Sequence, residues 1–225
     1  MKPGRINVNV MTKVDCTIDR VDNRMLDPDK TDALNGLKGY GESDLQSSII
    51  FSAGMNPRLY GAIAKYPDFF PDPSGEIKKQ VVLKVSDYRS AAIQGRFLVK
   101  KGIWVSEWRF ESGLNCGGHA FATQGMLMGP ILKEFKERRL ELIETLFPLY
   151  EAALAKTGRE IDGPPSHRFT VQGGLGTHEE HDTILKHYEA DATGWGSPFL
   201  LVPEVVRIDD EHLEKVREAG EKEIK

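Results

Sequence analysis

Short apolar runs rich in β-branched residues alternate with longer segments of helical patterning along most of this 225-residue chain. Runs of this length and composition are typical of buried strands, and crossover helices between them would make neighbouring strands parallel. The sequence therefore predicts an α/β fold with a parallel sheet. We expect strands over residues 5–12, 48–54, 80–86, 103–110, 167–174 and 192–202.

The segment between the third and fourth predicted strands is the clearest strand–helix–strand unit. Its sequence, "DYRSAAIQGRFLVKKG", ends in two lysines and Gly102, which is a favourable end for a helix. One face of that helix can carry its apolar side chains, Ala91, Ala92, Phe97 and Leu98.

Two segments are predicted as insertions into this core. Residues 15–47 are rich in Asp, Asn and Gly, so we expect mostly loop or short helix over one face. Residues 130–157 place apolar side chains at helical spacing around Pro148, which predicts a kinked packing helix. We interpret the whole chain, residues 1–225, as one domain.

Charge and cysteine content exclude several classes of function. A formal net charge of -4 gives no basic excess for binding nucleic acid. The sequence has no apolar run of membrane-spanning length and no apolar signal-peptide core, so we expect a cytoplasmic protein. The two cysteines, Cys16 and Cys116, are too few for a disulfide framework and have the wrong spacing for a zinc cluster. No metal site is predicted.

Glycines follow the last two predicted strands. The segment "TVQGGLGTHEEHD" continues from a strand into a helix that Thr177 and Glu180 can cap. A glycine turn before a helix presents free N–H groups to a phosphate, and the last two strands of α/β barrels commonly form such a site together. The next strand ends in "GWGSPF". The alternative is that these glycines serve the turn geometry alone.

A third glycine motif, "SGLNCGGHAFAT", follows the strand "IWVSEWRF". Gly117 and Gly118 would let a flat ring approach the backbone, and His119 would stand beside that ring with a pKa suited to moving protons. The alternative is a histidine held by hydrogen bonds in the core. Two other histidines, His178 and His181, fall on the predicted capped helix, where a solvated face is the simpler interpretation.

The segment "GLNCGGHAFAT" resembles the glycine-glycine-histidine motif of the FMN-dependent nitronate monooxygenases and of their relatives, the flavin-type enoyl-ACP reductases. Three further segments resemble strands of this family in the correct order along the chain: "INVNVMT", "SIIFSAGMNPRLYGAI" and "VQGGLGTHEEHDTILKHYEADATGWGSPFLLVPE". The resemblance implies a (β/α)8 TIM-type barrel that binds FMN.

The resemblance also implies functional positions at several strand ends. The residues it assigns to the FMN phosphate are Gly173, Gly174, Gly196 and Ser197. The residues it places beside the isoalloxazine ring are Gly117, Gly118 and His119, the last matching the family's catalytic histidine. Further candidates for contacts to the flavin or its ribityl chain are Asn9, Ser52 and Lys84.

From the resemblance we expect an FMN-dependent oxidoreductase like the nitronate monooxygenases, acting on a small organic substrate with His119 as acid or base. One alternative is an enoyl reductase that uses NAD(P)H to reduce the flavin. Another is a non-catalytic flavin-binding or regulatory domain of a larger assembly.

A closed barrel of this class needs eight strands and about 250 residues. The sequence offers about six strands, and the family's opening strands have no counterpart before Arg5. Either residues 15–47 contain a replacement for them or the barrel is incomplete, and we expect an incomplete barrel. The chain would be the C-terminal portion of a larger protein, or a homo-oligomer or partner chain would complete the barrel.

Overall fold

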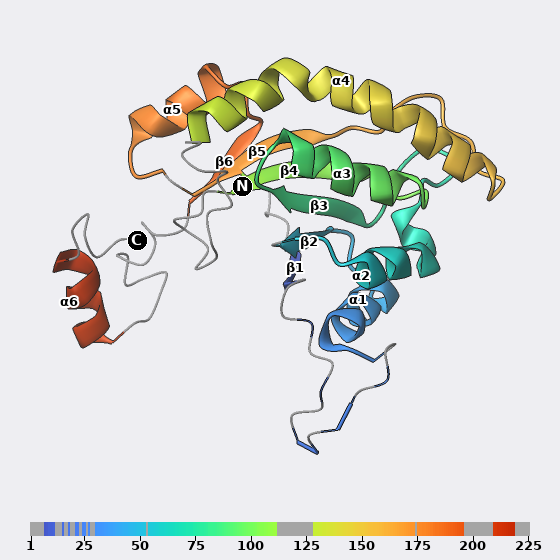
Figure 1. The fold of residues 1–225 in the computed structure, drawn as a ribbon, viewed down its shortest axis with the longest axis horizontal. Coiled ribbons are helices and arrows are strands. Elements are labelled where there is room, and N and C mark those ends of the chain that lie inside the picture. The colour runs from blue at the N-terminus through green and yellow to red at the C-terminus, as the bar shows by residue number, and fades with distance from the viewer. Residues whose placement is uncertain are drawn as a thin grey trace.

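The computed structural model describes residues 7–11, 15, 18, 21–22, 24–25, 27, 30–52, 54–111, 128–173, 175–195 and 209–218. The chain folds as an α/β structure around one six-stranded sheet (Figure 1). A strand lies in each of the six predicted ranges; β4 ends one residue beyond its predicted range, and parts of four other ranges lie outside the described residues. The strands are β1 (Val8–Met11), β2 (Ser48–Ser52), β3 (Gln80–Val85), β4 (Val105–Glu111), β5 (Arg168–Gln172) and β6 (Ala192–Gly194).

All neighbouring strands of the sheet are parallel, and their spatial order is the order of the sequence, β1-β2-β3-β4-β5-β6. Helices α1, α2, α3 and α4 contact one another in succession, as expected for one layer on one side of the sheet (Figure 1). Sequential strand order with a one-sided helix layer is the arrangement of a TIM-type barrel. Among the described strands β1 and β6 do not pair, so the sheet corresponds to part of such a barrel.

Helices supply the connections between strands. The helices are α1 (Asp32–Glu42), α2 (Pro57–Ala62), α3 (Tyr88–Val99), α4 (Met128–Ala155), α5 (His178–Lys186) and α6 (Asp210–Glu218), with short 3-10 turns η2 (Ile63–Lys65) and η3 (Pro67–Phe69). Helix α1 falls within the segment expected as loop or short helix, and it makes the crossover from β1 to β2. Helix α4 coincides with the predicted packing helix and makes the crossover from β4 to β5.

Helix α3 forms as its sequence pattern predicts. Asp87 caps its first turn by accepting a hydrogen bond from the Ser90 backbone N–H at 2.6 Å. Gly102 follows its end with a φ of +73°, a conformation that favours glycine. Two of the four predicted core residues, Ala91 and Leu98, are fully buried, and the other two pack against the core.

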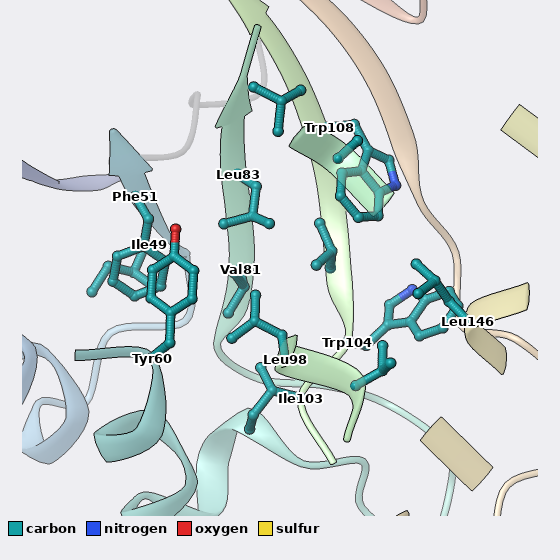
Figure 2. Packing of buried hydrophobic residues seen from close by; sticks show 14 of the residues in the cluster. Ile49, Phe51, Tyr60, Val81, Leu83, Leu98, Ile103, Trp104, Trp108 and Leu146 are labelled. Atoms are coloured by element: carbon teal, nitrogen blue, oxygen red, sulfur yellow. The ribbon is translucent and has the colours of Figure 1, made fainter. Parts of the chain in front are cut away.

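The main hydrophobic core lies between the sheet and the helices. Strand side chains at alternate positions enter it, including those of Ile49, Phe51, Val81 and Leu83 (Figure 2). The side chains that meet them come from the helices, from β4 and from the residues just before β4: Tyr60, Leu98, Ile103, Trp104, Trp108 and Leu146. Because strand side chains alternate in direction, the intervening residues face away from the helices. We call that side of the sheet the inner face.

Close packing of α3 against β4 leaves no room for a side chain at Gly95. A Cβ atom at this position would lie 2.5 Å from Cη2 of Trp108 and 3.0 Å from Cδ1 of Leu146. We expect Gly95→Ala to lower the free energy of unfolding by about 1–3 kcal/mol, because the core must shift to admit one methyl group. Urea-induced unfolding measures the change.

Gly39 of α1 provides the matched control, since a Cβ there meets nothing within 4 Å. Gly39→Ala should raise stability by about 0.4–1 kcal/mol because it restricts the unfolded chain at no steric cost. Equal effects of the two substitutions would contradict the close packing of α3 on Trp108.

Candidate functional site

The candidate site lies at the edge of the sheet where the strands end. Glu111 of β4 pairs in register with Gln172 of β5, and Gln172 pairs with Gly194 of β6. The Gly173 N–H donates a hydrogen bond to the Gly194 carbonyl at 2.8 Å, which ties the chain just beyond β5 to β6. The three glycine-bearing segments of the sequence therefore leave the sheet from neighbouring points. We call Glu111, Gln172 and Gly194 the strand-end row.

Two glycines at this edge occupy positions with little freedom for a side chain. Gly173 has a φ of +79°, so its conformation requires glycine or strains any other residue. At Gly194 a Cβ would lie 3.2 Å from Cγ of Gln172, tighter than usual van der Waals contact. The left-handed conformation at Gly173 and the close packing at Gly194 therefore fix the backbone where β5 and β6 end.

An ion pair on the inner face reaches the strand-end row. Lys84 Nζ lies 2.7 Å from Glu111 Oε1, and the two side chains are only 9% and 15% exposed. Lys84 pairs in register with Arg109, so Glu111 lies one inner-face position closer to the strand ends. The carboxylate thus draws the lysine ammonium toward the edge.

A second ion pair on the same face runs in the opposite direction. Arg109 Nη2 lies 2.6 Å from Glu107 Oε1, and Thr170 Oγ1 donates to that same oxygen at 2.7 Å. Since Glu107 precedes Arg109 by two residues, this pair holds the guanidinium toward the beginning of the strands. Lys84 is therefore the cation of the two that lies nearer to the candidate site.

A carboxylate of α5 itself, that of Glu180, already binds the backbone N–H groups at the start of this helix. Thr177 and Glu180 form the predicted capping box, which is confirmed. Glu180 Oε2 accepts hydrogen bonds from the backbone N–H groups of Gly176 at 2.7 Å and Thr177 at 3.0 Å. These backbone hydrogen bonds hold the pKa of the Glu180 carboxyl below its usual value. A phosphate at this helix end would have to displace Glu180, so the turn does not fit a phosphate as it stands.

A cavity of about 470 Å³ lies between the beginnings of α4 and α5 and includes Gly173. Apolar side chains make up much of its wall, among them Leu132, Val171 and Ile184. Glu179 and Glu180 add two carboxylates to its lining. Their charge makes this helix-side cavity unsuited to a phosphate.

The structure places some of the predicted site residues and not others. Lys84 reaches the edge through Glu111, and Gly173 lies at the edge itself. Ser52 is the last residue of β2, whereas Asn9 is exposed and precedes the end of β1 by two positions. The remaining predicted residues lie outside the described part of the chain: Gly117, Gly118, His119, Gly174, Gly196 and Ser197.

The two histidines of α5 play local roles. His181 Nδ1 lies 2.8 Å from Thr193 Oγ1 of β6, so this side chain joins α5 to the sheet. His178 is exposed and its ring stacks on that of His181 at a centroid distance of 6.1 Å.

The charged residues of β4 are absent from the set predicted from the sequence. Glu107, Arg109 and Glu111 all face the inner side, and the charges recur at every second position of "SEWRFE". Period-two charges inside a strand whose other residues are apolar mark one polar face. That alternation is the signal that could have identified them.

Comparisons with known proteins show the fold. No protein-family model matches the chain. No curated protein matches it either. Among solved structures, the chain is similar to the enoyl reductase domain of MlnA from the macrolactin biosynthesis cluster of Bacillus amyloliquefaciens, with a TM-score of 0.60 and 17% identity. The superposition covers 96% of this chain and 45% of that one, so this chain spans less than half its length.

None of the helices within the described ranges combines the length and the apolar character that crossing a bilayer requires.

Proposed function

We propose that this chain forms part of the flavin site of an FMN-dependent oxidoreductase that reduces a carbon–carbon double bond with NAD(P)H. The strand-end row is the observation that carries the proposal, because it brings the starts of the three glycine-bearing segments to one edge of a parallel sheet. In α/β barrels this edge holds the active site. The sequence motifs by themselves put nitronate oxidation first. The likeness to an enoyl reductase domain supports reduction instead.

The residues of this chain have distinct proposed roles. Bound FMN would supply hydride transfer between the nicotinamide and the substrate. Gly117 and Gly118 leave room beside the ring, and His119 holds the proton that the substrate carbon receives. Lys84, held by Glu111, offers a cationic hydrogen-bond donor at the same edge.

Fewer residues are available to bind the FMN phosphate than the sequence motifs indicate. The Gly173 N–H already donates to Gly194, and the N–H groups of Gly176 and Thr177 already donate to Glu180. We therefore propose that Gly174, Gly196 and Ser197 supply the donors for the FMN phosphate, and that Gly173 supplies the turn.

Anaerobic absorbance measurements with added FMN separate the three candidate functions. We expect NAD(P)H to bleach the flavin band and a short enoyl thioester to restore it. Bleaching by an alkyl nitronate but not by NAD(P)H would favour the nitronate monooxygenase alternative over ours. Bound flavin that responds to neither reductant would indicate a non-catalytic flavin-binding domain.

A further inference from the structure

A second cavity, separate from the strand-end row, lies at the beginning of the strands. Its volume is about 270 Å³, and every residue that lines it is polar: Asn7, Ser48, Gln80, Ser106, Glu107 and Arg168. Ser48, Gln80 and Arg168 are the first residues of β2, β3 and β5. Side chains inside α/β barrels are usually bulky and apolar, and this end of the strands usually serves stability. A cavity lined by polar residues at this end of the strands is therefore a candidate ligand site.

A β-bulge brings Ser106 into this cavity. Val81 pairs with Val105, but the next residue of β3, Val82, pairs with Glu107, so Ser106 is an extra residue in β4. Bulges redirect side chains and often lie beside functional sites. Ser106 is only 9% exposed, and its hydroxyl makes no hydrogen bond to any residue that the structure describes. A hydroxyl at the wall of a cavity is available to a ligand.

Arg168 contributes a positive charge that the neighbouring carboxylate does not neutralise. Although Arg168 pairs in register with Glu107, that carboxylate is held by Arg109 and Thr170. Within the described ranges the Arg168 guanidinium makes no ion pair and no hydrogen bond. A planar guanidinium matches a carboxylate in a two-point hydrogen bond.

We propose that this cavity binds a small hydroxylated carboxylate through Arg168 and Ser106. The guanidinium of Arg168 receives the carboxylate, while the hydroxyls of Ser48 and Ser106 bond the hydroxyl groups of the ligand. Glu107 lines the same cavity and repels a second negative charge, which disfavours a phosphate dianion. The small volume restricts the ligand to a few carbon atoms.

Isothermal titration of the full chain with D-glycerate tests this site. We expect a dissociation constant on the order of 1 mM, as is reasonable for so small a ligand. Arg168→Gln should weaken binding about ten- to a hundredfold because it removes a charged hydrogen-bonding partner. Ser106→Ala should weaken it about three- to tenfold, as expected for the loss of one neutral hydrogen bond.

A control variant and two further ligands show whether binding depends on the cavity and on the carboxylate. Arg89→Gln changes an exposed arginine of α3 outside the cavity lining and should leave binding unchanged. Glycerol lacks the carboxylate and should bind far more weakly than glycerate. Absence of glycerate binding, equal binding by Arg168→Gln and the parent, or tighter binding of inorganic phosphate than of glycerate would each overturn the proposal. None of these outcomes depends on flavin.

Discussion

His119→Ala is expected to keep FMN bound and to lose turnover by about a hundred- to ten-thousandfold, the usual effect of removing a positioned acid or base. The segment that carries His119 begins directly after Glu111, the member of the strand-end row that binds Lys84. Its proposed role is proton transfer to the substrate rather than retention of the cofactor. Steady-state turnover and flavin absorbance measured on the same sample separate the two effects.

His178→Ala is the control for this experiment. His178 is exposed on α5 and should tolerate the change with full turnover. A turnover rate of His119→Ala equal to that of the parent would mean that His119 has a structural role. Loss of bound flavin in His119→Ala would show instead that His119 holds the cofactor.

Lys79→Met is expected to lower the free energy of unfolding by about 2–4 kcal/mol. The Lys79 side chain is fully buried, and its ammonium donates to the carbonyls of Gly41 at 2.9 Å and Ser43 at 2.5 Å. It also contacts Asp68 at 3.2 Å. Removal of the ammonium leaves two carbonyls at the end of α1 without this donor.

Lys78→Met is the matched control, because the adjacent lysine binds the same carboxylate at 2.9 Å but is 45% exposed. A surface ion pair of this kind contributes below about 1 kcal/mol. Urea-induced unfolding of both variants compares the two lysines directly. Similar losses in the two variants would contradict the assigned role of Lys79 as the link between α1 and β3.

The sheet could be predicted from the sequence because its strands are short, apolar and separated by helical segments. Strands β2, β3 and β5 lie inside the predicted ranges. Helix α1 was harder to predict, since Gly36, Gly39 and Gly41 lower its intrinsic helix propensity. Burial of Leu37 and Tyr40 against the core compensates for this weakness.

Gly41 shows why local sequence gave little indication of that helix. A Cβ at this position would lie 2.5 Å from the Tyr66 ring, so glycine is required by a contact with a residue distant in the sequence. Tertiary contacts of this kind are invisible to a propensity argument.

The candidate site could be predicted in outline because glycine motifs follow strand ends. Its electrostatics could not, because the Lys84–Glu111 ion pair and the Thr170–Glu107 hydrogen bond depend on the register between β3, β4 and β5. The register brings Lys84 level with Arg109 and leaves each to pair with a different glutamate. The bulge at Ser106 is likewise a property of strand pairing and has no signature in the sequence.

Titration of FMN against the full chain, followed by quenching of flavin fluorescence, tests the central claim that flavin binds across the strand ends. Gly174→Leu should abolish binding, because a side chain would occupy the proposed phosphate position. Gly163→Leu is the control, since a Cβ there meets nothing within 4 Å, and it should bind FMN as the parent does. The account predicts saturable binding that is lost in Gly174→Leu alone. Equal FMN affinity of Gly174→Leu and the parent, or no binding by the parent, would contradict it.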